Sequence, residues 1–448
     1  MTIAMSYGQT VQQRLPDKTR ILFLLDGSGS MFAKWGDTDR MSAAKELLGD
    51  LVDSLRTNQN LELALRAYGH LYSRQARNCQ DTKLEVGFAK ANHDQIIRRL
   101  GFINPKGTTP IAYSLEQAAN DFPDAQGYRN IVIIITDGIE SCDGDPCAVS
   151  LALQRKGIFL KPFVIGIGMG KEYQKQFGCI GEYFDAEDVD SFKKALGKAL
   201  STSLDPTTVS IELLDENDRP TETDVVVSFI NNFTQWPVSD FVHYRDRQGR
   251  PDSLEIDAVL TYDLMVGTIP PVMKRNVRLR PGIHNIVEIK TPQGTLQIKQ
   301  PSANFYKNGV RAMVRKAGRN EIIHIHDINE SHKYLKGEYD LELLTLPRRV
   351  FKNVTIRQSK TTTIEVESPG ILNLRNTNKG YGSIYEVLSN GSQQWVFDLD
   401  HDQANMSLTM QPGDYKVVFR VDGAPGSKYT AIKTFRIRSG QSTTVSLF

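Results

Sequence analysis

Up to about residue 205 the chain alternates between short apolar runs and segments with helical spacing. The apolar runs predict buried strands at Ile21–Leu25, Leu61–Tyr68, Ile131–Ile135 and Phe163–Ile167. Apolar residues three or four apart predict helices over Met41–Leu55, His93–Leu100, Ile111–Asn120, Cys147–Gln154 and Ser191–Leu200. Continuous apolar strands that alternate with helices are typical of a parallel sheet covered on both faces. We therefore predict a doubly wound, Rossmann-like α/β domain over residues 18–203.

The helical spacing disappears after residue 205, where short alternating segments are separated by Gly, Pro and Asn. An internal repeat runs through this region, because Tyr262, Tyr339 and Tyr415 are 77 and then 76 residues apart. Pro270 and Pro347 follow the first two tyrosines at the same offset. We interpret the tyrosines as structural residues at strand corners rather than as ligand platforms. The repeat predicts three all-β modules, immunoglobulin-like or transthyretin-like sandwiches, over residues 205–291, 292–368 and 369–448.

Residues 1–17 precede the first strand as an N-terminal tail. The first eight, MTIAMSYG, resemble the end of a secretory signal peptide but lack its basic start and longer apolar core. One hypothesis is that Met1 is an internal methionine of a longer precursor and that the mature chain starts near Gln9. A plain disordered tail is the alternative. No apolar run reaches the roughly 18 residues of a membrane-spanning helix, so we expect no direct transmembrane segment.

Composition and charge exclude several classes of protein. The 448 residues are 40% hydrophobic and 24% charged, which is ordinary for globular domains. Lys and Arg number 54 against 52 Asp and Glu, a formal net charge of +2, and neither half of the chain is biased. A nucleic-acid binder usually concentrates basic residues on one domain, so we expect no nucleic-acid partner.

Oxygen-bearing side chains gather where predicted strands end and helices begin. The first strand runs into the sequence DGSGS, the sequence GTTP precedes a helix, and TDG follows the strand Ile131–Ile135. In an open α/β sheet, ligands bind at the carboxyl ends of the strands. The side chains form a hard, all-oxygen set suited to Mg²⁺, with Mn²⁺ or Ca²⁺ as alternatives. The predicted metal site consists of Asp26, Ser28, Ser30, Thr109 and Asp137.

The makeup of this set indicates binding rather than catalysis. Two carboxylates nearly neutralise a divalent ion, and three hydroxyls add no charge. If one carboxylate acts only through a water, the ion stays partly electrophilic and a coordination position is left for an outside carboxylate. The set contains no obvious nucleophile or base. We therefore predict a protein partner that offers an Asp or a Glu side chain.

On these motifs the sequence resembles the von Willebrand factor A domain with its metal-ion-dependent adhesion site, over roughly residues 18–203. The resemblance implies that Ser28, Ser30 and Thr109 are direct or near-direct ligands and that Asp26 and Asp137 ligate the metal or act through water. It narrows to a secreted bacterial branch with cysteines at the same places, and this implies a periplasmic, secreted or cell-surface location. The segments that carry this narrower resemblance are Ala67–His70, Asn78–Thr82, Thr136–Cys147 and Gly178–Ile180. The turn after Cys179 is shorter than in that branch, which leaves the position of the last strand open.

All four cysteines, Cys79, Cys142, Cys147 and Cys179, lie in the predicted α/β domain. An even number confined to one domain indicates disulfides formed in an oxidising compartment, with inert core thiols as the alternative. Four cysteines allow three pairings. Cys142 and Cys147 flank one loop beside Asp137, where a bridge would stiffen the rim of the metal site, so we favour their pairing with each other.

Residues near the metal turn suggest a contact rim and a competing hypothesis. Lys34, Trp35 and Glu140 are candidates for a rim that contacts the partner, although Trp35 packed under the loop is an equal alternative. A metal-dependent hydrolase would need a general base near the ion, and Glu140 and His70 are the candidates. The sequence has no Ser-His-Asp order, HExxH motif or phosphate-binding loop, so we expect no enzymatic activity.

The sequence as a whole favours a non-enzymatic, extracytoplasmic adhesion or assembly protein. The α/β domain would dock an acidic residue of a partner through the metal. The β modules would act as a stalk or a second interaction surface in a cell-envelope complex. The alternative is a permanent structural subunit of such an assembly, with the metal in a structural role.

Three histidines in the second β module form the remaining candidate cluster. His324 and His326 lie two residues apart, so on one face of a strand, and His332 is near in the sequence. This spacing is compatible with a zinc site, but we interpret it as a solvated strand face.

Overall fold

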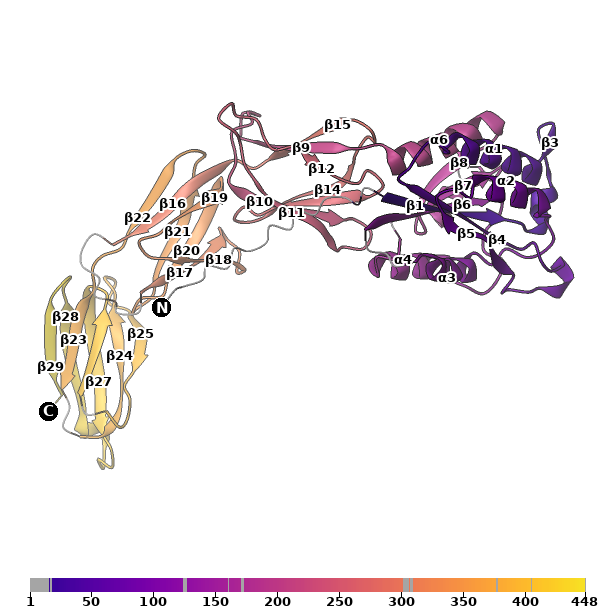
Figure 1. The fold of residues 1–448 in the computed structure, drawn as a ribbon. Coiled ribbons are helices and arrows are strands. Elements are labelled where there is room, and N and C mark those ends of the chain that lie inside the picture. Colours follow the sequence, from indigo (N-terminus) through magenta and orange to yellow (C-terminus); the bar gives the residue numbers. More distant parts are fainter. Residues whose placement is uncertain are drawn as a thin grey trace, which may run out of the picture. The chain divides into compact units, whose positions relative to one another are not determined.

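The structure is a computed structural model (Figure 1), and it describes residues 16, 18–123, 127–159, 161–170, 173–300, 306, 309–375, 378–403 and 405–447. The tail 1–17, with the start of the mature chain expected near Gln9, lies outside the described residues except for Pro16. Contacts divide the chain into two compact units. One consists of Met1–Glu212, Val226–Met265 and Met273–Val287, and the other of Leu213–Val225, Val266–Val272 and Glu288–Phe448.

The α/β domain is built on a six-stranded sheet in the order β5-β4-β1-β6-β7-β8. Its strands are β1 (Lys18–Asp26), β4 (Leu61–Tyr68), β5 (Thr82–Ala89), β6 (Tyr128–Thr136), β7 (Phe163–Ile167) and β8 (Glu182–Ala186). Neighbouring strands run parallel except β4 and β5, which are antiparallel. The predicted doubly wound α/β fold is confirmed, and the antiparallel edge strand β5 is an addition that we did not predict. The last strand, β8, pairs in register with β7 from Phe163 opposite Glu182 to Ile167 opposite Ala186.

Helices cover both faces of this sheet (Figure 1). They are α1 (Arg40–Ser54), α2 (His93–Phe102), α3 (Ile111–Asp121), α4 (Pro146–Arg155), α5 (Gln174–Phe177) and α6 (Val189–Leu204). Short elements complete the domain: the 3₁₀ turns η1 (Gly29–Phe32) and η2 (Arg74–Ala76), and the hairpin of β2 (Lys34–Trp35) and β3 (Thr38–Asp39). Asp145 caps the N-terminus of α4 by accepting hydrogen bonds from two backbone N–H groups.

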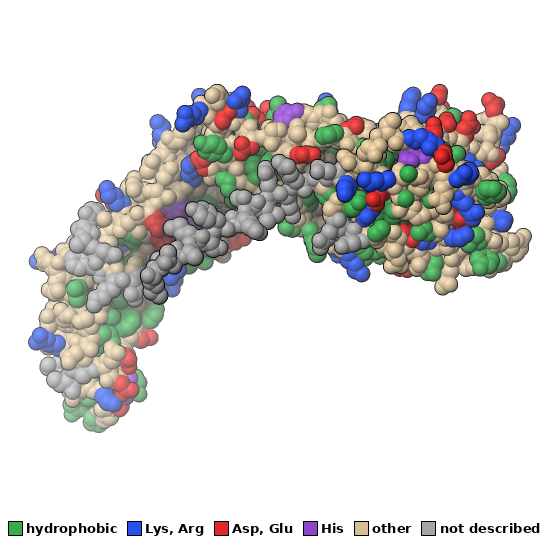
Figure 2. Space-filling view, in the orientation of Figure 1, with side chains coloured by type: hydrophobic (Ala, Val, Ile, Leu, Met, Phe, Trp, Pro, Cys, Tyr) green, Lys and Arg blue, Asp and Glu red, His purple; other side chains and the backbone are tan. Residues whose placement is uncertain are grey.

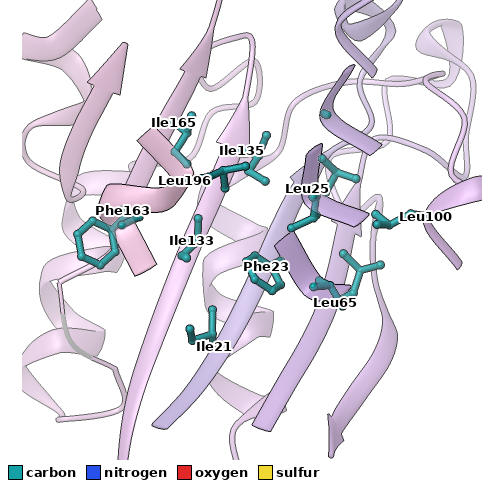
Figure 3. Close-up of a cluster of buried hydrophobic side chains, with 14 of the residues drawn as sticks. Ile21, Phe23, Leu25, Leu65, Leu100, Ile133, Ile135, Phe163, Ile165 and Leu196 are labelled. Carbon is teal, nitrogen blue, oxygen red and sulfur yellow. The ribbon is translucent and has the colours of Figure 1, made fainter. Parts of the chain in front are cut away.

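Alternate side chains of β1 enter two separate cores. Ile21, Phe23 and Leu25 belong to the cluster that includes residues of α1, α2 and α6, and Figure 3 shows these three side chains among the other members of that cluster. Leu22 and Leu24 belong to the opposite cluster, with α3 and α4. A strand buried on both faces has no solvated side, which is why β1 and β6 appear in the sequence as continuous apolar runs.

Beyond α6 the described chain forms three pairs of sheets, each with one four-stranded and one three-stranded member. The first pair is β11-β10-β13-β14 with β12-β9-β15, the second is β18-β17-β20-β21 with β19-β16-β22, and the third is β25-β24-β27-β28 with β26-β23-β29. The prediction of several all-β sandwiches is therefore confirmed. The limits 205–291, 292–368 and 369–448 stay predictions.

The strands of the first pair are β9 (Thr208–Leu214), β10 (Val225–Asn231), β11 (Pro237–His243), β12 (Leu254–Glu255), β13 (Thr261–Val266), β14 (Val272–Arg278) and β15 (His284–Lys290). Those of the second are β16 (Gln293–Lys299), β17 (Arg311–Lys316), β18 (Ile322–Asp327), β19 (Ser331–Leu335), β20 (Gly337–Leu343), β21 (Arg349–Ile356) and β22 (Thr361–Glu365). Those of the third are β23 (Gly370–Arg375), β24 (Gly380–Val387), β25 (Gln393–Asp398), β26 (Asn405–Met410), β27 (Gly413–Val421), β28 (Thr430–Ile437) and β29 (Ser442–Ser446), with the 3₁₀ turn η4 (Ser427–Tyr429).

The three repeated tyrosines are buried structural residues, as we predicted. Each hydroxyl donates to a backbone carbonyl four or five residues upstream: Tyr262 to Asp257 at 2.7 Å, Tyr339 to Leu335 at 2.7 Å and Tyr415 to Gln411 at 2.7 Å. This is the geometry of a tyrosine corner, which fixes the entry of a strand into the sandwich. Burial raises the pKa of Tyr339 to about 12.

The histidine cluster differs from our interpretation. His326 is fully buried, so a solvated strand face is wrong for this residue. Its Nδ1 and that of His324 lie 3.0 and 2.7 Å from the Tyr334 hydroxyl, and its Nε2 lies 3.2 Å from the Glu330 carbonyl. Internal hydrogen bonds therefore replace the water that we expected. Among the described residues no group of three or more His, Cys, Asp or Glu has a metal-binding arrangement.

We expect Tyr339→Phe to lower the free energy of unfolding by about 1–2 kcal/mol, because the Leu335 carbonyl loses its buried donor. Tyr381→Phe is the matched control, since its side chain is 65% exposed. Urea denaturation of the full chain measures both. Equal stability of the two variants would refute a structural role for the corner hydroxyl.

Acidification should weaken the second sandwich. Burial lowers the pKa values of His324 and His326 below the ordinary 6.5, so the unfolded chain takes up protons before the folded one. Stability is then complete above pH 6.5 and falls as the pH drops through that value. Pulse proteolysis at pH 7.5 and 5.5, scored for cleavage within residues 293–365, should show a larger increase in wild type than in His326→Gln. His284→Gln, at an exposed histidine, should behave as wild type, and an identical increase in all three proteins would contradict the prediction.

Candidate metal site

The predicted metal-binding side chains lie at the carboxyl edge of the sheet, where the strand order reverses. From β1 the chain continues to β4 on one side, and later to β6 on the other. Asp26 is the last residue of β1, and Asp137 follows directly after β6. Ser28 and Ser30 lie at the turn η1, and Thr109 lies two residues before α3. This is the switch point at which doubly wound folds bind ligands.

A chain of hydrogen bonds connects three of these side chains. The Ser28 and Ser30 hydroxyl oxygens are 2.9 Å apart, and the Ser30 hydroxyl donates to Asp137 Oδ1 at 2.8 Å. A methyl group built on Gly138 would lie 3.9 Å from Thr109 Oγ1 and 4.0 Å from Ser30 Oγ, so both hydroxyls border this glycine.

Asp26 is fully buried and is hydrogen-bonded to the start of this chain at Ser28. Its Oδ1 accepts from the Ser28 backbone N–H at 2.7 Å, and its Oδ2 accepts from the Thr136 hydroxyl at 2.7 Å. The structure thus brings the five predicted residues to one edge, with Ser30 exposed and the other four buried.

Burial controls the electrostatics of the site. Desolvation, and then the nearby charge of Asp137, raise the pKa of Asp26 to about 6, although hydrogen bonds from Thr136 and Ser28 oppose this rise. Burial also raises the pKa of Tyr68, which pairs with Asp26 across β1 and β4. Asp137 has a cationic partner, because Arg40 Nη1 lies 2.7 Å from its Oδ2.

The donor set fits a small divalent cation. It offers two carboxylates and three hydroxyls, which are the hard oxygen ligands that Mg²⁺ prefers. A buried pair of carboxylates is costly without nearby positive charge; Arg40 supplies one such charge, and a divalent ion would supply more. No group of three or more His, Cys, Asp or Glu with a metal-binding arrangement is present among the described residues. The candidate site would not form such a group, because three of its five predicted ligands are Ser or Thr.

Polar contacts tie the surrounding loops together. The Asp81 carboxylate accepts from the backbone N–H groups of Leu71 and Tyr72 at 3.1–3.2 Å, which fixes the loop after β4. The Thr109 backbone N–H donates to the Ser141 hydroxyl at 2.7 Å, and the Ser141 N–H donates back to the Thr109 carbonyl at 3.1 Å. Thr109 is therefore positioned by the loop that follows Asp137.

Two disulfides join Cys79 to Cys142 and Cys147 to Cys179. Our expectation that Cys142 pairs with Cys147 is wrong. Cys147 lies in the first turn of α4 and reaches the segment after α5, whereas Cys142 lies in the loop after β6 and reaches the loop before β5. The bridge at the rim of the site is thus Cys79–Cys142.

The candidate rim residues have different environments. Lys34 is exposed, but Trp35 is only 7% exposed, so a contact role for Trp35 is wrong. Its indole N–H donates to the Glu187 carbonyl at 2.8 Å, and its ring meets Phe192 edge to face. Trp35 therefore packs under the loop.

The two candidates for a general base both make side-chain contacts, although the buried His70 Nδ1 has no hydrogen-bond partner among the described residues. Glu140 accepts from the backbone N–H groups of Ala112 and Cys142 at 2.7 and 2.8 Å, so both of its oxygens serve the start of α3 and the neighbouring loop. His70 Nε2 lies 2.9 Å from Glu85 Oε1.

Sequence reasoning missed Arg40, Thr136, Tyr68 and Asp81. Thr136 and Tyr68 were within the quoted motifs, and their positions next to predicted strand ends were the available signal. Arg40 had no such signal, because a single arginine before a helix is usually a solvated residue.

Comparison with known proteins agrees with this architecture. The model of the von Willebrand factor type A domain matches residues 21–198. Uncharacterized protein YwmD of Bacillus subtilis (strain 168) is 31% identical over 209 residues, which are 44% of this chain and 92% of that protein. Uncharacterized protein YwmC of the same organism is 30% identical over 175 residues, 37% of this chain and 76% of that protein.

One solved structure with a similar domain is the conserved hypothetical protein BatB from Bacteroides thetaiotaomicron. It is 21% identical, with a TM-score of 0.34, and the match covers 41% of this chain and 98% of that chain.

The fold is a doubly wound α/β domain, and its candidate ligand site lies at the carboxyl ends of β1 and β6. The chain belongs to the family of von Willebrand factor type A domain proteins.

We expect replacement of both Cys79 and Cys142 by serine to weaken Mg²⁺ binding several-fold, because the loop that positions Thr109 loses its covalent anchor. The double variant of Cys147 and Cys179 is the matched control. Each loss should cost about 4 kcal/mol of stability in the chain-entropy account, for loops of 63 and 32 residues. Isothermal titration with Mg²⁺ separates the effects, and equal affinity of both variants would contradict a role of the first bridge in the site.

Proposed function

We propose that this protein is a non-enzymatic, extracytoplasmic binding protein that docks an acidic residue of another protein through a divalent cation. The cation is Mg²⁺, with Mn²⁺ or Ca²⁺ as alternatives, held by Asp26, Ser28, Ser30, Thr109 and Asp137. The observation that carries this proposal is the chain from Ser28 through Ser30 to Asp137, together with the buried Asp26 that is hydrogen-bonded to Ser28.

The charge of the set favours an outside carboxylate. Two carboxylates balance a divalent cation, and the hydroxyls leave it electrophilic. Ser30 is the exposed member, so the set opens to solvent on its side. An incoming Asp or Glu would therefore meet the cation there and fill its open coordination position.

Exposed apolar residues around the site support a protein partner. Phe32, Leu71, Tyr72 and Ile139 are 41–65% exposed. They lie on three loops: Phe32 ends η1, Leu71 and Tyr72 follow β4, and Ile139 follows Gly138. We name these four residues the apolar collar. Large exposed apolar side chains that gather around a polar site are typical of protein interfaces.

The environment of the acid and base candidates argues against a hydrolase. Both oxygens of Glu140 accept backbone hydrogen bonds, and Nε2 of His70 is paired with Glu85. Catalysis would need a base free to accept a proton near the ion.

The charge distribution and the disulfides bear on two further parts of the proposal: that the partner is not a nucleic acid, and that the protein is extracytoplasmic. On the face drawn in Figure 2, basic and acidic side chains are interspersed over the described surface of the α/β domain, unlike the basic stripe that is typical of a nucleic-acid-binding face. Two disulfides in one domain are typical of an oxidising compartment, so we place the protein in the periplasm, at the cell surface or outside the cell. None of the helices in the described parts of the chain has the length and apolar character needed to span a membrane.

The proposal also assigns a role to the β modules. They serve as a stalk or a second interaction surface in a cell-envelope complex. A permanent structural subunit with a structural metal is the alternative, and the behaviour of the complex in EDTA separates the two.

We expect partner capture from native envelope extracts to require the cation. Partner recovered on the full chain in Mg²⁺ should fall about tenfold or more in EDTA and with Asp26→Ala, because the bridge to the partner's carboxylate is lost. Asp50→Ala, an exposed carboxylate on α1, is the matched control and should bind as wild type. Capture that persists in EDTA would move the interface to another surface and favour the structural alternative.

The apolar collar gives a separate prediction. Phe32→Ser should weaken partner capture while leaving Mg²⁺ affinity unchanged, because the phenyl ring is 65% exposed and its residue is not a predicted ligand. Val189→Ser, an exposed apolar residue of α6, is the control. Equal capture by both variants would remove the apolar collar from the interface.

A further inference from the structure

Arg40 occupies an unusual position for a basic residue. It is the first residue of α1, directly after the N-cap Asp39, and its backbone N–H donates to the Ala33 carbonyl at 3.1 Å. The N-terminus of a helix carries partial positive charge and disfavours a cation. The position of Arg40 therefore needs a compensating partner, and Asp137 provides it, with Nη1 2.7 Å from Oδ2.

The fold makes room for the guanidinium. Gly168 follows β7 with φ +62°, and a methyl group built on it would lie 3.2 Å from Arg40 Nη2 and 3.4 Å from Nε. The same methyl group would lie 3.4 Å from Trp35 Cδ1, so the buried indole and the guanidinium both lie next to Gly168. Only 20% of the Arg40 side chain is exposed, and its buried Nε meets no hydrogen-bond acceptor among the described residues.

The Arg40 guanidinium therefore contributes a positive charge to the candidate metal site. Asp26 and Asp137 are both buried carboxylates, and the Asp137 side chain has no exposed surface. When no metal is bound, Arg40 offsets the negative charge of Asp137. When a divalent ion is bound, the same guanidinium adds one positive charge next to it and repels it.

We propose that Arg40 is a built-in counter-ion that competes with the metal for Asp137 and couples metal binding to partner binding. This inference rests on the proposed function. With Arg40 present, the two carboxylates and the divalent ion leave one surplus positive charge, which the partner's carboxylate neutralises. Metal alone is then held weakly, and metal with partner is held firmly. By linkage, each strengthens the binding of the other by the same factor.

Titration of the full chain with Mg²⁺ alone tests this inference. Arg40→Gln should bind Mg²⁺ about tenfold or more tightly than wild type, because a positive charge close to the ion is removed in a site of low dielectric. Arg40→Lys keeps the charge and should stay close to wild type. Arg56→Gln is the matched control, since this arginine follows the other end of α1 and pairs with Asp53 and Asp94 at the surface.

Thermal unfolding supplies a second readout. In EDTA, Arg40→Gln should melt below wild type, because Asp137 loses its counter-ion, and Mg²⁺ should raise its melting temperature more than that of wild type. Equal or weaker Mg²⁺ binding by Arg40→Gln, with binding by wild type intact, would overturn the role of Arg40 and leave the proposed metal site standing. Absence of Mg²⁺ binding in both proteins would instead refute the metal site and this inference with it.

Discussion

The burial of Asp26 at the end of the central strand is the constraint on which the candidate site depends. Strand β1 is buried on both faces, so its last residue has no route to solvent along the sheet. A carboxylate in that position must be matched by donors and by positive charge. The Ser28 N–H and the Thr136 hydroxyl supply the donors, Arg40 supplies charge through Asp137, and the proposed cation would supply the remainder.

Polar contacts connect the loops around this carboxylate, and Met31 and Trp35 also anchor the loop after β1 in the apolar core. Asp81 and Ser141 accept hydrogen bonds from backbone N–H groups of neighbouring loops, Glu140 accepts one from the first turn of α3, and one disulfide joins the loop before β5 to the loop after β6. Such anchoring keeps donor oxygens in place before a ligand arrives, which lowers the entropic cost of binding. The apolar collar on these loops stays exposed, where a protein partner can contact it.

Much of the fold follows from local patterns, whereas the chemistry of the site depends on contacts between distant segments. The runs around Leu22 and Ile133 predicted strands because burial on both faces demands apolar residues at every position. Strand β5 was missed because an edge strand lacks that signal. The proximity of the five candidate ligands was predictable because each lies near a strand end or the start of a helix, but Arg40 and the pairing of Cys79 with Cys142 were not predictable in this way. Their partners lie 97 and 63 residues away, and only the folded chain brings them together.

The most direct measurement for the central claim is a crystal structure of the full chain in Mn²⁺, with data collected at the manganese absorption edge. The account predicts one anomalous peak per chain in the α/β domain, within direct coordination distance of the Ser28, Ser30 and Thr109 oxygens. Asp26 and Asp137 should contact that ion directly or through water. A manganese peak only at another location, or no peak at the ends of β1 and β6 while Arg40 remains on Asp137, would contradict the account.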